Sequence, residues 1–172
     1  MNPVKDNPAK NSPLIAFRGK LDTLCAIILE AQLLGGEKEN RAFVEDMQEI
    51  LNFTRSLLPA EYKDIPLGEY RLSGLAPQEI RERSHHPQRY FGLDHLLMHQ
   101  SMGPLSLRLN LLRTAARETE LAAIAAFRDP EDSAICRRGD IAEALNILSG
   151  LLYILMYKYL PQDYSFAGKA GI

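Results

Sequence analysis

The stretch from Ala144 to Met156 is apolar on nearly every side of a helix, which constrains the fold of this 172-residue chain more than any other feature. A helix that is apolar all round must be enclosed by other elements. The longest apolar run, residues 145–157, is shorter than the roughly 20 residues that cross a bilayer, and it contains Asn146 and Ser149. We therefore expect a core helix in a protein that does not enter a membrane.

Three further segments have helical patterns and can enclose this helix. Their apolar residues recur at helical spacing or run on without strand-like alternation. The expected helices cover residues 14–34, 43–58 and 104–128. Gly35-Gly36 is expected to end the first helix and Pro59 the second, while Pro104 suits the first turn of the third.

The sequence predicts an all-α fold, an up-and-down bundle of four long helices plus a short one at residues 76–84. In the last long helix, Asp140 and Glu143 have the D-x-x-E spacing of a capping box, so we interpret them as caps rather than catalytic groups, and Pro161 ends the helix. We expect one domain over residues 14–161, with tails at residues 1–13 and 162–172.

Composition excludes several classes of function. The net charge of −2 and the lack of basic runs with interleaved aromatic residues argue against nucleic-acid binding. Cys25 and Cys136 form no CxxC pair, which excludes a zinc knuckle and favours free thiols in a reducing compartment. The first 13 residues have no apolar region of the kind found in signal peptides, so we expect a cytoplasmic protein.

The long irregular segment at residues 60–103 contains every histidine of the chain. A connection of this length inside a compact domain is usually functional. A metal site is disfavoured, because cysteine is absent here and only one Glu-x-x-His match occurs, at Glu82 and His85. The histidines are His85, His86, His95 and His99.

The helix at residues 104–128 carries Arg113, Arg117 and Glu120 on one face. Two arginines four residues apart repel each other mildly, so the pair suits a site for phosphate or carboxylate groups. A solvated charged stripe is the alternative. Asn146 of the last helix must bond either a neighbouring helix or a ligand.

Four motifs, taken in order, resemble the ATP:cob(I)alamin adenosyltransferases, and specifically their ethanolamine-utilisation type. The motifs are FRGKLD (17–22), SHHPQRYFGLDHL (84–96), LNLLRTAARETE (109–120) and EALNILSGLLYILM (143–156). The resemblance covers roughly residues 15–160, and the ordered run is far more specific than any one motif. It implies a five-helix bundle that transfers the 5′-deoxyadenosyl group of ATP to the cobalt of a reduced corrinoid, with Mg²⁺ on the triphosphate.

By motif position, the resemblance also implies roles for individual residues. Arg117 and Asn146 would contact ATP and take part in catalysis together with Glu120, which would orient Arg117. Arg113 would pair with Asp22 across a subunit boundary, in a homo-oligomer that is a dimer or trimer. Arg18 and Arg113 are further candidate ATP contacts. Arg18 and Asp22 also have the i, i+4 spacing of a weak intrahelical ion pair.

The resemblance assigns the irregular segment to the corrinoid. The candidate corrinoid-binding residues are His85, Arg89, Tyr90, Phe91, Asp94 and His95, whereas His86 and His99 do not fit the pattern. Ile147 stands where the family motif has arginine, and Gly150 stands where the propanediol-utilisation type has aspartate. The ethanolamine type's N-terminal Cys/His metal-binding region has no counterpart here, so we expect no resident metal site. A non-catalytic helical bundle that binds a corrinoid or a nucleotide is the alternative function.

Overall fold

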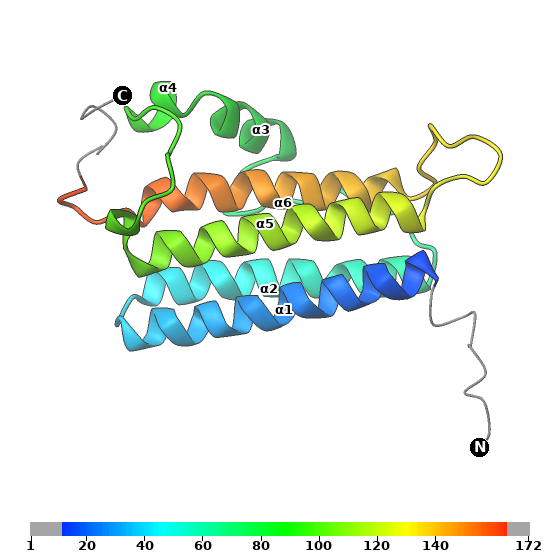
Figure 1. Ribbon diagram of the computed structural model, residues 1–172, viewed down its shortest axis with the longest axis horizontal. Helices are drawn as coiled ribbons and strands as arrows, with labels where there is room; N and C mark the ends of the chain where they lie inside the picture. The colour runs from blue at the N-terminus through cyan, green and yellow to red at the C-terminus, as the bar shows by residue number, and fades with distance from the viewer. Residues whose placement is uncertain (1–11, 165–172) are drawn as a thin grey trace, which may run out of the picture.

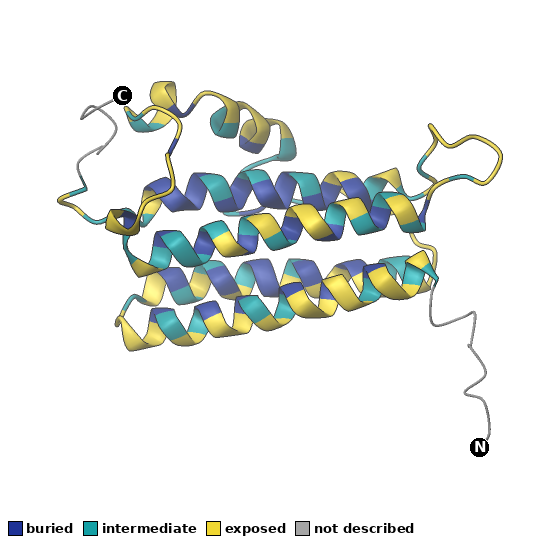
Figure 2. Cartoon of the chain, in the orientation of Figure 1, coloured by how far each residue is buried: buried dark blue, intermediate teal, exposed yellow. Residues whose placement is uncertain are grey.

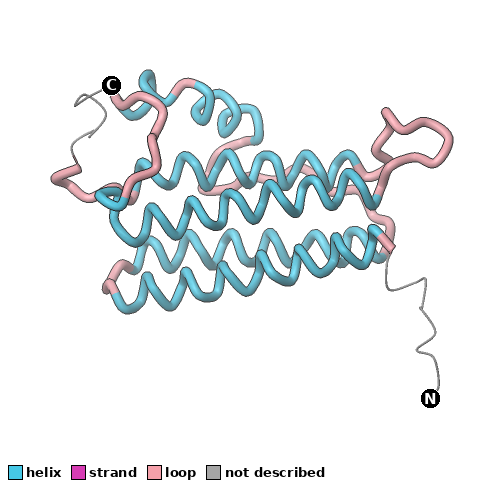
Figure 3. The backbone as a smooth tube through the Cα atoms, in the orientation of Figure 1, coloured by secondary structure: helices cyan, strands magenta, loops and turns pink. Residues whose placement is uncertain are grey.

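Four long helices lie side by side and form the body of the protein (Figure 1). The computed structural model describes residues 12–164. The long helices are α1 (Pro13–Glu37), α2 (Arg41–Tyr62), α5 (Gly103–Ala126) and α6 (Gly139–Lys158). Helix α5 packs against both α1 and α6, and α1 packs against α2. The predicted all-α bundle is confirmed, and Figure 3 shows helices and loops without strands over the described residues.

Residues 63–102, which we call the covering segment, connect α2 to α5 and lie over the outer side of α6 (Figure 1). Two short α-helices and one 3₁₀ turn occur here, instead of the single short helix that was predicted. They are α3 (Pro77–His85), α4 (Pro87–Phe91) and η2 (Gln100–Met102). Helix α3 packs against α6. The Glu79 carboxylate begins α3 by accepting a hydrogen bond from the backbone N–H of Ala76 at 2.8 Å.

The predicted end of the first helix at Gly35-Gly36 was wrong, because α1 continues to Glu37. Gly35 is buried against α2, and a Cβ atom there would lie 2.7 Å from Cδ1 of Phe43. This glycine therefore permits a close approach of two helices and does not terminate one. At the other end of α1, Pro13 is the first helical residue and not part of a tail.

The predicted end of the second helix at Pro59 was also wrong. Helix α2 continues to Tyr62 with Pro59 inside its last turns. Proline removes one N–H donor but keeps its carbonyl, which accepts the backbone N–H of Lys63 at 3.0 Å. A proline in the last turns of a helix is therefore a poor guide to its last residue.

Asp140 and Glu143 do not form the predicted capping box. Arg138 is the N-cap residue of α6 and makes no side-chain capping bond. The Asp140 carboxylate instead accepts hydrogen bonds from Arg138 Nε at 3.0 Å and from the backbone N–H of Leu67 at 2.9 Å. Glu143 accepts from Arg81 of α3 at 3.2 Å. Both carboxylates attach the covering segment to α6.

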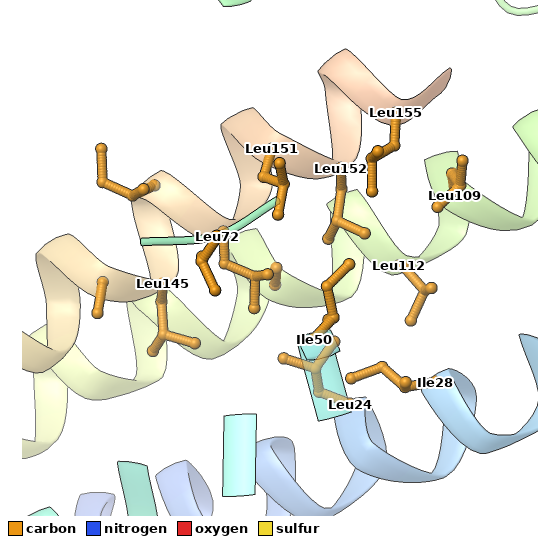
Figure 4. Packing of buried hydrophobic residues seen from close by; sticks show 14 of the residues in the cluster. Leu24, Ile28, Ile50, Leu72, Leu109, Leu112, Leu145, Leu151, Leu152 and Leu155 are labelled. Atoms are coloured by element: carbon orange, nitrogen blue, oxygen red, sulfur yellow. The ribbon is translucent and has the colours of Figure 1, made fainter. Parts of the chain in front are cut away.

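The core of the bundle is built from leucine and isoleucine side chains of all four long helices, together with Leu72 from the covering segment (Figure 4). Helix α6 is 20 residues long and passes the length and composition test for a membrane-crossing helix, although its apolar run at residues 145–157 is shorter than the helix. Yet 67% of the 18-residue window of α6 that passes this test is buried inside the protein, as in the core helix of a soluble protein (Figure 2).

Most of the two predicted tails lies outside the described residues, which begin at Ser12 and end at Tyr164. Both cysteines are free thiols. Burial raises the pKa of the Cys25 thiol.

Candidate functional site

A groove of about 360 Å³ opens where α3 crosses α5 and α6, and we call it the first groove. Three of the predicted ATP contacts, Arg113, Arg117 and Asn146, lie together in its wall. The full lining is Ile80, Arg81, Ser84, His85, Arg113, Arg117, Asn146, Ile147, Ser149, Gly150 and Tyr153. The two arginines come from one face of α5, while the asparagine comes from α6.

Glu120 joins the arginine and the asparagine of this groove. Its Oε1 atom accepts a hydrogen bond from Asn146 Nδ2 at 3.0 Å, and its Oε2 atom lies 3.3 Å from Arg117 Nη1. The Glu120 side chain is only 13% exposed, and its Oε2 atom is buried without a hydrogen bond from any described residue. A buried carboxylate oxygen in this state can accept one more donor. Asn146 thus bonds a neighbouring helix and also faces a groove.

Arg113 is held on its own helix. Its Nε and Nη2 atoms both donate to Asn110 Oδ1, at 3.1 and 2.9 Å. The Nη1 atom makes no hydrogen bond within the described chain, and the residue lines the first groove. Both arginines of the predicted pair therefore border a shared cavity, as an anion site requires.

Gly150 lets α3 come close to α6 beside the first groove. A Cβ atom at this position would lie 3.3 Å from Cγ2 of Ile80 and 3.4 Å from Oγ of Ser84. Ile147, which stands where the sequence resemblance leads us to expect an arginine, lines the groove and is 2% exposed. This part of the wall is therefore apolar.

A second groove of about 550 Å³ adjoins the first, and His85 lines both. Four of the predicted corrinoid-binding residues lie here, together with His86, which does not belong to the family pattern. The lining is His85, His86, Pro87, Gln88, Arg89, Asp94 and His95. The groove is formed by α4, by the junction of α3 with α4 and by the loop after α4.

The other two predicted corrinoid contacts, Tyr90 and Phe91, do not line this groove. The Tyr90 hydroxyl donates to Glu82 Oε1 at 2.6 Å, and this bond raises the pKa of Tyr90. Phe91 stacks on Tyr157 of α6, with ring centroids 4.6 Å apart. Tyr90 thus stabilises the α3–α4 junction, and Phe91 attaches α4 to the bundle.

Two tyrosines of α6, Tyr153 and Tyr157, hold the loop after α4, and the sequence reasoning missed both. The Tyr153 hydroxyl lies 3.1 Å from His95 Nδ1 and accepts the backbone N–H of Leu96 at 3.0 Å. The Tyr157 hydroxyl donates to the carbonyl of Asp94 at 3.0 Å. Two tyrosines at i, i+4 on a helix that is otherwise buried and apolar could have revealed this role, because buried hydroxyls need partners.

Arg18 lies outside both grooves, and the suggested intrahelical pair with Asp22 was wrong. Its Nε and Nη2 atoms donate to the two carboxylate oxygens of Glu61, each at 3.0 Å. This hydrogen bonding raises the pKa of Arg18. Asp22 is exposed on α1 and forms no ion pair within residues 12–164, and α1 lies on the far side of α5 from α6 (Figure 1). His99 bonds Ser101 and stays outside the grooves.

No three His, Cys, Asp or Glu side chains come together in a group that could hold a metal ion between residues 12 and 164. The carboxylates near the first groove are already bonded: Glu120 accepts from Asn146 and lies beside Arg117, and Glu143 accepts from Arg81.

Residues 5–159 match the family described as cobalamin adenosyltransferase. The chain belongs to this family. Among curated proteins, it is similar to the corrinoid adenosyltransferases EutT of Escherichia coli strain K12 and of Salmonella typhimurium strain LT2. The identity to each is 34% over 148 residues, which make up 86% of this chain and 53% of the relative. The chain thus spans about half the length of these relatives. No solved structure matches it.

Proposed function

We propose that this member of the cobalamin adenosyltransferase family transfers the 5′-deoxyadenosyl group of ATP to the cobalt of reduced cobalamin. The electron pair of Co(I) attacks the ribose C5′ carbon and forms the cobalt–carbon bond. The bond between C5′ and its oxygen breaks, and triphosphate leaves with that electron pair. ATP and cobalamin are both substrates, so the protein must hold two ligands in contact and neutralise the departing charge.

The observation that carries this proposal is the adjacency of two grooves with different linings. The first groove has three arginines, Arg81, Arg113 and Arg117, and an asparagine, which suit a nucleotide triphosphate. The second, which shares His85 with it, is the larger and is lined by the histidine-rich loop. Two ligands bound in adjoining grooves would meet at the shared histidine.

On the nucleotide side, Arg117 would bind the triphosphate and Asn146 the nucleoside, with Glu120 holding both in place. The Arg117 side chain is half exposed, so its guanidinium is free to reach a ligand, whereas Glu120 is nearly buried. Arg113 keeps Nη1 for a phosphate or for a partner carboxylate. Mg²⁺ would arrive bound to the phosphate oxygens of ATP and reduce their repulsion.

On the corrinoid side, His85, Arg89, Asp94 and His95 would contact the ligand directly. Tyr90 and Phe91 would act indirectly, by fixing α4 to α3 and to α6. We expect this chemistry to occur in the cytoplasm, because it requires ATP and a cobalt kept in its reduced state.

We further propose that the protein is a homo-oligomer, a dimer or trimer, in which Asp22 of one subunit pairs with Arg113 of another. Within the described chain Asp22 lies on α1 and Arg113 on α5, and no ion pair joins them. Apolar side chains on the outer faces of α1 and α5 remain unusually exposed, which favours a covering subunit. They are Leu29, Leu33, Leu111 and Leu121. Arg18, which lies outside the grooves of its own subunit, would reach ATP only across such an interface.

A second candidate function is a bundle that binds a corrinoid or nucleotide without catalysis. The observation that favours it is Ile147, an apolar side chain in the wall of the first groove at the position of a family arginine. One cation fewer at the triphosphate weakens the stabilisation of the leaving group.

The test is an anaerobic assay with chemically reduced cobalamin, ATP and Mg²⁺, followed by the absorbance of a light-sensitive product. We expect turnover by the wild type. In Arg117→Ala we expect the rate to fall about a hundredfold, because the variant lacks one positive charge that stabilises the leaving triphosphate. Arg108→Ala is the matched control. Arg108 lies on the same helix and is paired with Glu30 at 2.9 Å, away from both grooves, so its loss should leave the rate unchanged.

Three outcomes separate the candidates. Turnover that depends on Arg117 supports the adenosyltransferase. A cobalamin spectral shift without product supports the binding module. The absence of any response to ATP and cobalamin, in both the assay and a thermal-shift experiment, contradicts both candidates.

A further inference from the structure

The two tyrosines of α6 form a chain of hydrogen bonds in which the position of every proton can be worked out. The Tyr157 hydroxyl lies 3.0 Å from the carbonyl oxygen of Asp94, which can only accept, so Tyr157 uses its one proton there. The hydroxyl oxygens of Tyr153 and Tyr157 are 2.9 Å apart. Since the proton of Tyr157 is already used, Tyr153 must donate in this second bond.

The same accounting extends to His95. Tyr153 has used its only proton on Tyr157, and its oxygen accepts the backbone N–H of Leu96 at 3.0 Å. Its contact of 3.1 Å with His95 Nδ1 is therefore a hydrogen bond only when Nδ1 carries a proton. In a neutral imidazole the other nitrogen, Nε2, then has a free lone pair.

We propose that Tyr153 is a positioning residue that fixes neutral His95 with its proton on Nδ1, so that the Nε2 lone pair is left to accept a hydrogen bond from a ligand in the second groove, which His95 lines. The chemical group that this acceptor fits is an N–H donor, such as the primary carboxamides around the rim of a corrinoid. The choice of ligand rests on the proposed function, whereas the position of the proton follows from the hydrogen bonds alone.

Two features keep this arrangement in place. Burial raises the pKa of Tyr157, so its proton remains available to the carbonyl of Asp94. The Tyr157 ring stacks on Phe91 and makes an edge contact with Tyr153, at centroid distances of 4.6 and 5.4 Å. Tyr153 also lines the first groove, so one side chain touches the nucleotide groove and holds a residue of the corrinoid groove.

His99 provides a comparison within the same chain. Its Nδ1 atom accepts the backbone N–H of Ser101 at 3.2 Å, which requires an unprotonated Nδ1. Neutral His99 therefore carries its proton on Nε2, the opposite of the assignment for His95.

The test is a long-range proton–nitrogen NMR spectrum of the histidine rings at about pH 8.5, above the usual histidine pKa. His95→Gln and His99→Gln variants assign the two signals. In the wild type we expect a protonated Nδ1 for His95 and a protonated Nε2 for His99. A His95 signal with the proton on Nε2 overturns the proposal.

Three tyrosine-to-phenylalanine variants test the individual hydrogen bonds between the two tyrosines and His95. In Tyr157→Phe, Tyr153 loses its acceptor and can turn its proton to His95 Nδ1, so we expect the His95 proton to move to Nε2. In Tyr153→Phe the ring loses its partner, so we expect a mixture of both forms. Tyr159→Phe is the control, because Tyr159 bonds Asp46 at 2.6 Å and touches neither His95 nor Leu96. An unchanged His95 signal in Tyr157→Phe contradicts the proton accounting.

A cobalamin titration then tests the ligand. Tyr157 lines neither groove, yet we expect Tyr157→Phe to weaken cobalamin binding roughly threefold to tenfold, the loss of about one hydrogen bond, with ATP binding unchanged. Equal cobalamin affinity despite a displaced proton overturns the acceptor role. If the wild type binds no cobalamin, the proposed function fails, while the NMR result still decides the state of His95.

Discussion

The four-helix bundle and the covering segment are held together by different means. The bundle is an apolar core in which side chains of all four long helices are fully buried. The covering segment contributes only a few buried side chains, among them Leu72, Ile80 and Leu96, and otherwise depends on polar anchors from α2 and α6. The first groove lies between the two regions, and the second lies within the covering segment. A bundle that keeps its shape can thus support a cover that opens locally to admit ligands.

The largest expected effect is a loss of global stability when Leu112, which is fully buried in α5, is shortened. We expect Leu112→Ala to lower the free energy of unfolding by about 3 kcal/mol, the loss of apolar contacts plus the cavity left behind. Leu96→Ala removes the same atoms from the covering segment. It should cost less in global stability and instead speed hydrogen exchange in residues 91–102.

Urea unfolding followed by far-UV circular dichroism measures the first effect, and hydrogen exchange with mass spectrometry measures the second. If Leu96→Ala shifts the unfolding midpoint as far as Leu112→Ala, the cover and the bundle form one cooperative unit. The contrast between the regions would then be lost.

The next effect concerns the adjacent glycines Gly35 and Gly36 within the bundle. A Cβ at Gly35 would lie 2.7 Å from a buried ring atom of Phe43, whereas one at Gly36 would meet nothing within 4 Å. We expect Gly35→Ala to destabilise the protein by about 2 kcal/mol through overpacking. Gly36→Ala should stabilise it by about 0.5 kcal/mol, because alanine favours the helix.

Thermal unfolding of both variants measures this pair. If the unfolding temperature shifted equally and in the same direction in both variants, the corner between α1 and α2 could relax. The bundle would then be less tightly packed there than the contact at Gly35 suggests.

The bundle could be predicted from sequence because burial imposes a period that can be read residue by residue, as in α6. Helix ends were harder: Gly35 serves helix packing, Pro59 sits within a last turn, and Asp140 bonds a distant segment instead of its own helix. Each of these depends on a tertiary neighbour that local pattern does not contain.

The candidate site likewise contains residues that could be predicted from sequence and residues that could not. Arg113, Arg117 and Asn146 were predicted together and do line one groove, since helical spacing and motif position both point to them. Tyr153 and Tyr157 were missed, because their backbone partners, Leu96 and Asp94, lie 57 and 63 positions away in the sequence. Arg18 was grouped by motif with the ATP contacts but bonds Glu61 in the folded chain.

The smallest expected effect is a pH-dependent contribution to stability from Asp140, the first anchor of the covering segment. Its bonds with Arg138 and the Leu67 N–H hold the pKa of this carboxyl below its usual range. A carboxyl whose pKa is lower in the folded state contributes stability above its unfolded pKa of about 3.9, and that contribution is lost as the pH falls through the folded pKa. Asp140→Asn should therefore cost about 1 kcal/mol at neutral pH, and this difference from the wild type should shrink below about pH 4.

Urea unfolding of both proteins from neutral to acid pH measures this difference. Glu131→Gln is the control, because it removes one exposed carboxylate from the loop between α5 and α6. A difference between wild type and Asp140→Asn that stays constant below pH 4 would show that the side chain acts by shape and not by charge. Since Asp140 anchors the cover rather than the bundle, the same variant should also raise hydrogen exchange near Leu67 before it affects α1 or α5.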